Sequence, residues 1–168
     1  MTQLIDNIKY VKNTKYLDIS NKCIKDGPNK INKIFDIYDL RELYMANVQM
    51  DTIPDVILNI LTLEVLDISY NKIVELPDTL FNLTNLSMLN ISCNSFLKIP
   101  TGISFLKNLK ELSINETKLT ELSLEIFQLK NLEKLHANNL LINHIPKEIG
   151  QLVNLKELII SDNAICEL

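Results

Sequence analysis

The stretch "LEVLDISYNKIVELPDTLFNLTNL", from Leu63 to Leu86, contains one full period of a repeat and the first residue of the next. Leucine recurs at this 23-residue interval through most of the chain. An interval of this length is typical of repeat architectures, in which each unit buries its apolar edge against its neighbours. The leucines that mark the interval are Leu40, Leu63, Leu86, Leu109, Leu132 and Leu155.

Each unit has the same internal pattern when its first leucine is counted as position 1. Apolar residues follow at positions 4 and 6, as Leu66 and Ile68 show, and this alternation is typical of a short half-buried strand. Position 15 is a proline in most units, such as Pro77, and apolar residues three apart follow it, such as Leu80 and Leu83. That spacing predicts a helical or 3₁₀ return after the proline.

The quoted stretch and the later "LKELIISDNAI" resemble leucine-rich repeats of the 23-residue class with a Leu-Pro turn, and the resemblance covers essentially the whole chain. It implies an α/β solenoid, a curved horseshoe with a parallel β-sheet on its concave face and short helical or 3₁₀ returns on its convex face. We therefore predict a single domain, residues 1–168. Its units are 1–13 (partial), 14–39 (degenerate), 40–62, 63–85, 86–108, 109–131 and 132–154 (complete), and 155–168 (partial).

Position 9 departs from the pattern of the family, which places an asparagine there to hydrogen-bond backbone groups of neighbouring turns. Only Asn71, Asn94 and Asn163 keep it. Because buried backbone groups need partners, we expect local irregularity near residues 46–50 and 138–142.

The two ends of the chain depart from the regular unit. In residues 14–39 the return is three residues longer, which predicts one extra helical turn there. The chain stops in mid-repeat at Leu168 without a visible polar cap. A short protein with a modestly exposed edge, a fragment, and end-to-end association all remain open, and we expect a monomer rather than an end-to-end oligomer.

Composition excludes several classes of partner and location. The net charge is −4, which argues against nucleic acid and anionic membranes because both require a basic face. The first residues lack the apolar core of a signal peptide, and no stretch is long and apolar enough to insert into a membrane. Three cysteines without paired spacing suit free thiols in a reducing compartment, so we predict an intracellular, cytoplasmic location.

Candidate catalytic and metal-ligating residues are few. His136 and His144 are the only histidines, and the repeat register places the first on a strand and the second past the turn, too far apart to share a metal. The cysteines stand three repeats apart, and we expect Cys93 to be the most exposed of them. Three glycines cannot build a phosphate-binding loop. We predict no enzyme activity, no cofactor and no metal.

The evidence for a binding function comes from the outward strand positions, which form columns along the predicted concave face. Seven acidic residues occupy these columns against Lys134 alone, and tyrosines cluster towards the N-terminal half. Aromatic side chains commonly anchor protein interfaces while charge steers approach, although incidental surface tyrosines remain the alternative. The predicted partner-binding residues are Tyr16, Asp18, Glu42, Tyr44, Asp67, Tyr70, Met88, Asn90, Glu111 and His136.

The sequence thus predicts a non-enzymatic leucine-rich-repeat protein that binds another protein through its concave sheet, in a scaffold, adaptor or regulatory role. We expect a partner with a basic and partly apolar surface. The alternative is a fragment or sensor part of a larger signalling enzyme, or of a pathogen or viral effector, whose other domains are absent. To test the concave face we expect Tyr44→Ala with Asp67→Lys to abolish partner capture without lowering the melting temperature.

Overall fold

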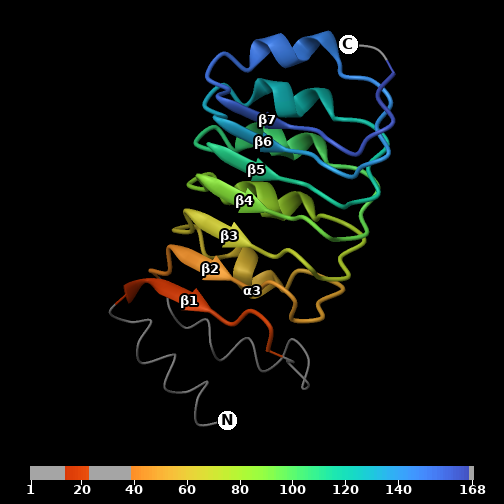
Figure 1. Cartoon of the computed structure of the whole chain (residues 1–168). Coiled ribbons are helices and arrows are strands. Elements are labelled where there is room, and N and C mark those ends of the chain that lie inside the picture. Colours follow the sequence, from red (N-terminus) through yellow and green to blue (C-terminus); the bar gives the residue numbers. More distant parts are fainter. Residues whose placement is uncertain (1–13, 23–38, 167–168) are drawn as a thin grey trace.

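The computed structural model describes residues 14–22 and 39–166. Seven short parallel strands form one sheet in chain order, and consecutive units stack one on another (Figure 1). This is the predicted open solenoid. The strands are β1 (Tyr16–Asp18), β2 (Glu42–Tyr44), β3 (Val65–Asp67), β4 (Met88–Asn90), β5 (Glu111–Ser113), β6 (Lys134–His136) and β7 (Glu157–Ile159).

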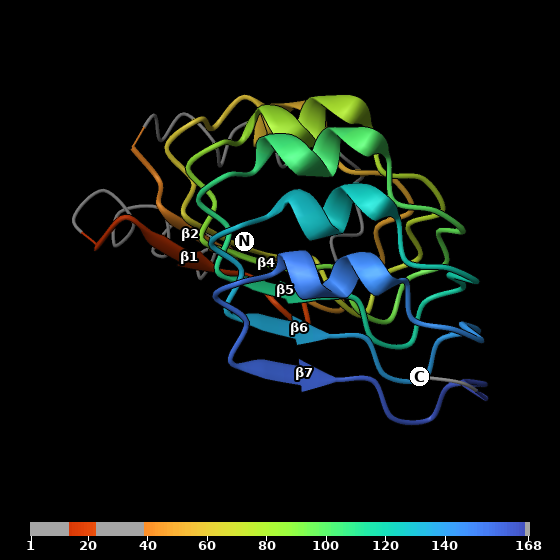
Figure 2. The same cartoon turned by 90° about the horizontal axis from the view of Figure 1, so that it is seen from above.

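Helical returns lie on the opposite side of the molecule from the strands (Figure 2). A residue with φ near −60° to −70° precedes each of them, and proline fixes φ in this range. Ser123 stands where the other units have proline and adopts the same conformation, with φ of −61°. The returns are α3 (Asp55–Leu58) and the 3₁₀ helices η1 (Asp78–Asn82), η2 (Thr101–Phe105), η3 (Leu124–Gln128) and η4 (Lys147–Gln151).

The strands pair without any shift in register, so equivalent positions of successive units are direct neighbours. Position 4 therefore forms a continuous leucine column inside the core. Leu43, Leu66 and Leu89 in this column are fully buried, and Leu158 in the last described strand is 37% exposed. Each unit is thus covered by the one that follows it, as the repeat pattern predicts.

Asparagine side chains at position 9 link neighbouring turns. The amide of Asn71 donates to the carbonyl of Met45 in the preceding unit, and its Oδ1 accepts from the N–H groups of Val48 and Met50. In the units that begin at Leu109 and Leu132, which lack this asparagine, position 7 supplies part of the link. There Oδ1 of Asn115 accepts from the N–H of Asn138 at 2.8 Å.

The predicted irregularity appears at only one of its two places. Every unit with a described strand has a left-handed residue at position 8, and residues 46–50 contain an additional one, Gln49, with φ of 68°. Among residues 138–142 only the periodic Asn139 is left-handed. Oδ1 of Asn163 accepts from the Leu140 N–H, which explains the regular backbone there. The extra helical turn predicted within residues 14–39 falls on residues 23–38, outside the described residues.

A second side-chain ladder, at position 23, lies where each return leads into the next strand. The amide of Asn108 donates to the carbonyl of Thr84, and Asn131 and Asn154 repeat the bond one and two units later. Unlike position 9, this column is intact from Asn85 onward. The position 23 ladder holds neighbouring units in register where the chain enters each strand, and the position 9 ladder does so after each strand ends.

Gly102 in η2 packs directly against the buried Phe81 of the preceding return. A Cβ at this position would lie 2.7 Å from Cδ2 of Phe81, well inside normal contact distance. A Cβ on Gly150 in η4 would instead enter open space, with no atom within 4 Å. Close stacking of η1 and η2 thus depends on a missing side chain.

We predict that Gly102→Ala lowers the free energy of unfolding by about 1–3 kcal/mol, because the added methyl group overpacks the contact with Phe81. The matched control Gly150→Ala should be neutral or slightly stabilising, since alanine favours helical backbone over glycine. Urea denaturation measures both variants. Equal effects of the two substitutions would contradict the close approach.

Candidate protein-binding site

The strand pairing turns the predicted columns of the sheet face into rows of neighbouring side chains. Tyr16 of β1 lies beside Glu42 of β2, Glu42 lies beside Val65 of β3, and this row continues to Glu157 of β7. Two positions further on each strand, Asp18, Tyr44 and Asp67 are neighbours in the same way, in a row that continues to Ile159 of β7. Adjacent strands are about 4.8 Å apart, so side chains on one face contact each other across the rows.

On β1 to β3 these rows bring together Tyr16, Asp18, Glu42, Tyr44 and Asp67, here called the tyrosine–acid cluster. The rings of Tyr16 and Tyr44 are 5.4 Å apart between centroids and tilted by 45°. The hydroxyl of Tyr44 donates to Oε2 of Glu42 at 3.2 Å. Burial and the carboxylate of Glu42 raise the pKa of Tyr44 to about 12, so its hydroxyl stays a donor into the alkaline range.

The three carboxylates of the cluster differ in how firmly they are held. Asp67 accepts from the Ser69 N–H and hydroxyl and from Nδ2 of Asn90. Asp18 accepts the Ser20 N–H, and Glu42 accepts only the Tyr44 hydroxyl within the described residues. Asp67 is thus part of the structure of the turn, which makes Asp67→Lys a poor probe of binding alone.

On β5 to β7 two acidic residues of the same face, Glu111 and Glu157, are bonded to other side chains. Oε2 of Glu111 lies 3.3 Å from Nζ of Lys134. His136 bridges its neighbours, with Nε2 3.0 Å from Oε1 of Glu157 and Nδ1 3.3 Å from the hydroxyl of Ser113. Two carboxylates in the C-terminal half of the face are therefore already engaged by neighbouring side chains.

Ser113, His136 and Glu157 have the residue types of a hydrolytic triad, but the surroundings that such a site needs are not present around them. The Ser113 side chain is buried, with 8% of the residue exposed, so a substrate could reach it only if neighbouring side chains moved. The adjacent N–H of Ile114 donates to the carbonyl of His136, so it cannot serve as an oxyanion donor. The geometry fits a structural bridge.

The ten predicted site residues thus fall into separate groups. Five form the tyrosine–acid cluster, Glu111 and His136 belong to the paired network, and Met88 and Asn90 lie between the two on β4. Tyr70 is 60% exposed at the left-handed position after β3. A hydrogen bond to Cys93 raises the pKa of Tyr70. Tyr70 is thus linked to the turn that contains Cys93 and not to the tyrosine–acid cluster.

The prediction that Cys93 is the most exposed cysteine is wrong. Among the described residues Cys166 is exposed, whereas Cys93 is half-buried beside Tyr70 and Glu116. Burial raises the pKa of the Cys93 thiol, which disfavours its nucleophilic thiolate form. Cys23 lies outside the described residues.

The two histidines have different surroundings. His144 lies past the turn, where Nδ1 is 2.8 Å from Oδ1 of Asn143, and it shares no partner with His136. Within residues 14–22 and 39–166 no group of three or more His, Cys, Asp or Glu side chains is arranged to hold a metal ion. Among the same residues no helix is long and apolar enough to cross a membrane.

The sequence columns missed a second surface, on the return side, where exposed apolar residues line a furrow. Val74 and Leu97 occupy position 12 of adjacent units, and both are more than half exposed. The sequence does contain a signal for this surface, because apolar residues recur at a position that belongs neither to the core nor to the sheet face.

The raised pKa of Tyr44 predicts an unusual alkaline titration. Because the folded-state pKa lies above the ordinary value of 10.0, the protonated hydroxyl stabilises the fold below pH 10, and this contribution is lost as the pH rises towards 12. At about pH 11 the native wild type and Tyr44→Phe should show the same tyrosinate absorbance. In denaturant at the same pH, the tyrosinate absorbance of the wild type should exceed that of Tyr44→Phe by the contribution of one tyrosine. A lower tyrosinate absorbance in native Tyr44→Phe than in the native wild type would contradict the raised pKa of Tyr44.

A family model described as a leucine-rich repeat region matches residues 3–138. A search of curated proteins found no match. Among solved structures the chain is similar to a leucine-rich-repeat protein of Leptospira interrogans, at 30% identity and a TM-score of 0.78, over 92% of this chain and 40% of that one. This chain therefore spans less than half of that protein.

Two further solved structures are similar. Internalin C2 of Listeria monocytogenes matches at 19% identity and a TM-score of 0.75, over 98% of this chain and 85% of that one, a likeness of fold alone. The leucine-rich-repeat ectodomain of a plant membrane receptor kinase from Arabidopsis thaliana matches at 30% identity and a TM-score of 0.70, over 79% and 17%. Because the family model covers most of the residues, the chain belongs to the leucine-rich-repeat family, whose domains bind other proteins.

Proposed function

We propose that this domain binds another protein through the tyrosine–acid cluster on β1 to β3 and that the partner presents a basic, partly apolar surface. One observation carries the proposal. Two contacting tyrosines lie among three carboxylates, and none of the three forms an ion pair with a basic side chain in the described part of the chain.

Tyrosine rings and carboxylates contribute differently to such an interface. A tyrosine buries a large apolar area on binding while its hydroxyl keeps a hydrogen-bond partner, as Tyr44 does with Glu42. The ring faces of Tyr16 and Tyr44 also attract a lysine or arginine side chain. The carboxylates speed the approach of a positively charged partner and disfavour an acidic one. Together they favour a partner that presents basic and apolar groups side by side.

The C-terminal half of the face is a weaker candidate for the same reason. A basic partner binding at Glu111 or Glu157 would have to displace Lys134 or His136 from the existing pairs. The displaced interaction reduces the net gain from any new ion pair. We therefore assign recognition to the N-terminal half and a supporting role to β5 to β7.

We further propose that the domain is non-enzymatic, acts as a scaffold, adaptor or regulator, and works inside the cell. Domains of this family are typically interaction modules without catalytic activity. The unreactive surroundings of Cys93 and the structural bridge at His136 support the absence of chemistry here. Free Cys93 and Cys166 support a reducing compartment.

A second candidate is that the domain is the sensor or binding part of a larger signalling protein or effector. The similarity to a receptor kinase ectodomain, of which this chain covers 17%, favours it. An antibody against the domain applied to extracts of the source organism tests this candidate. A band much larger than 19.3 kDa supports it, and a single band near that mass contradicts it.

We predict that Tyr44→Ala combined with Glu42→Lys weakens capture of the partner by at least about 30-fold, because the pair loses an aromatic anchor and reverses a steering charge. Capture from extracts of the source organism, followed by mass spectrometry and titration with the purified partner, measures the loss. Glu42→Lys replaces Asp67→Lys here because Glu42 makes fewer contacts within the fold.

The matched control is Asp51→Lys, which makes the same charge change at an exposed residue away from the sheet face. It should leave binding within about threefold of the wild type. Melting temperatures of all variants verify that the fold is intact. Equal loss in the control and in the double variant, with intact folds, would overturn the assignment to this face.

A further inference from the structure

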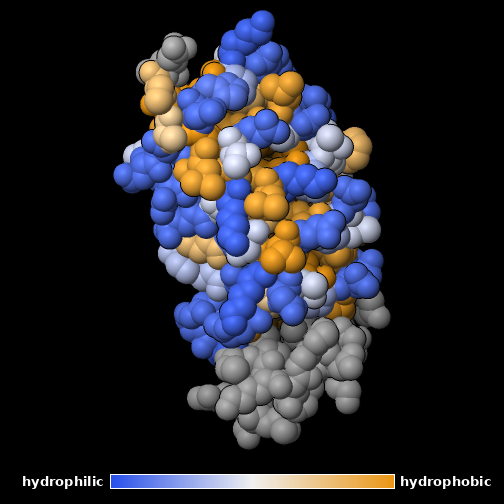
Figure 3. Space-filling model, turned by 90° about the vertical axis from the view of Figure 1, so that its right-hand side faces the viewer, coloured by the Kyte–Doolittle hydropathy of each residue, from blue (hydrophilic) through white to orange (hydrophobic). Residues whose placement is uncertain are grey.

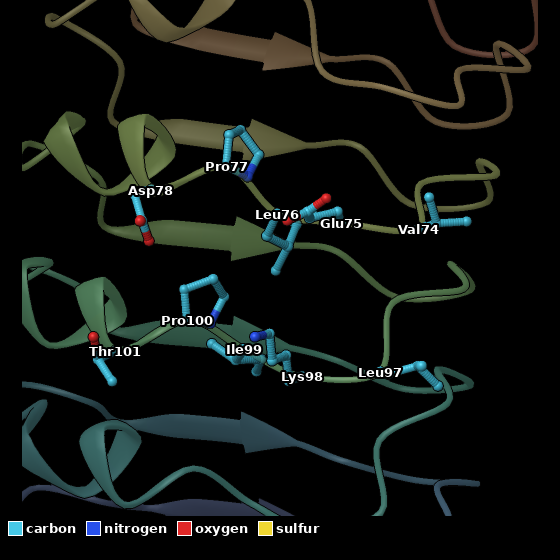
Figure 4. A pocket seen from close by; sticks show the side chains of 10 residues that line it. All are labelled: Val74, Glu75, Leu76, Pro77, Asp78, Leu97, Lys98, Ile99, Pro100 and Thr101. Carbon is cyan, nitrogen blue, oxygen red and sulfur yellow. The ribbon is translucent and has the colours of Figure 1, made fainter.

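A furrow runs across the return side of the molecule, where the chain passes from each turn back to the helical return. It consists of two open hollows that share Lys98 and Ile99. The first, of about 640 Å³, lies between residues 74–78 and 97–101, and Figure 4 shows equivalent residues of these two units side by side along it. The second, of about 600 Å³, continues towards residues 121–125 and 144–148. We call the two together the Leu-Pro furrow.

The furrow exposes apolar side chains on three successive units. Val74, Leu97 and Leu124 are 63%, 68% and 54% exposed, and all three line the hollows. Pro77 and Pro100 add apolar surface between them. On the side where the turns follow the strands, hydrophobic side chains form a broken band among hydrophilic ones (Figure 3). Single exposed apolar residues need no explanation, but a contiguous set in a hollow is typical of an interaction surface.

The charges around the furrow identify the kind of partner. Lys98 is the only lysine or arginine that lines the hollows, beside His144 and five carboxylates, and none of the five forms an ion pair within the described residues. Lys98 lines both hollows, so the negative charge lies towards the two ends. The carboxylates are those of Glu75, Asp78, Glu121, Glu125 and Glu148.

We infer that the Leu-Pro furrow binds a segment of another protein that carries apolar side chains flanked by lysine or arginine. The apolar floor supplies contact area, and the carboxylates at both ends complement a basic segment. Five carboxylates disfavour nucleic acid, and they also disfavour a second copy of this chain, because a symmetric contact would oppose like charges. The furrow lies on the return side, away from the tyrosine–acid cluster, so it is a second site beyond the proposed function.

A library of displayed random peptides, selected on the immobilised domain, tests the inference. We expect selected peptides to be enriched in lysine or arginine next to leucine, isoleucine or phenylalanine. Their affinity for Leu97→Glu should fall at least tenfold, because the substitution places a carboxylate on the apolar floor. Lys98→Glu should tighten binding severalfold by removing the only lysine that lines the furrow, which provides a second readout if Leu97→Glu folds poorly.

The control for Leu97→Glu is Leu61→Glu, the same substitution at a leucine that is 56% exposed outside the furrow. It should leave the affinity unchanged, as should the double variant of Tyr44 and Glu42. Peptides that lose binding only to that double variant would support the sheet face and overturn the furrow. Failure to select any peptide, enrichment of acidic peptides, or dimerisation of the wild type that Leu97→Glu abolishes would also overturn the inference.

Discussion

The whole structure depends on the unshifted parallel register that places the position 4 leucines in one buried column. Each strand is only three residues long and cannot bury an apolar face alone. Stacking Leu43 on Leu66 and Leu66 on Leu89 supplies the burial. A shift by one residue would turn these side chains to the opposite face, so the register is strongly specified.

The same register creates the two proposed binding surfaces. It aligns the outward side chains of β1 to β3 into the tyrosine–acid cluster, and it aligns the segments around Pro77 and Pro100 into the Leu-Pro furrow. The asparagine ladders at positions 9 and 23 fix the turns and the strand entries on either side of the sheet. The two proposed sites lie on different sides of one stack, and two such sites would suit the proposed scaffold or adaptor role.

Charge distinguishes the two halves of the sheet face. Counted from the sequence, the acidic residues of the face lie on or just after β1, β2, β3, β5 and β7, yet Glu111 of β5 and Glu157 of β7 are bonded to Lys134 and His136. The carboxylates beside Tyr16 and Tyr44 keep their charge available. Because exposed ion pairs contribute little to stability, this pairing matters more for where a basic partner binds than for how stable the fold is.

Periodicity predicted most of the fold. Repeated leucines and prolines specified the strands, the returns and the columns, because each position has the same surroundings in every unit. Side-chain pairing within the columns was not predictable, since it depends on how far Lys134, His136 and Asn90 reach across neighbouring strands. The exposure of Cys93 was mispredicted because its contacts come from Tyr70 and Glu116 of adjacent units.

The central claim is that the N-terminal half of the sheet face binds the partner. Hydrogen–deuterium exchange of the domain, with and without the captured partner, tests it most directly. The account predicts slower exchange on binding in β1 to β3 and the turns that follow them, with little change on the sheet face of β5 to β7. Protection confined to β5 to β7 would contradict it.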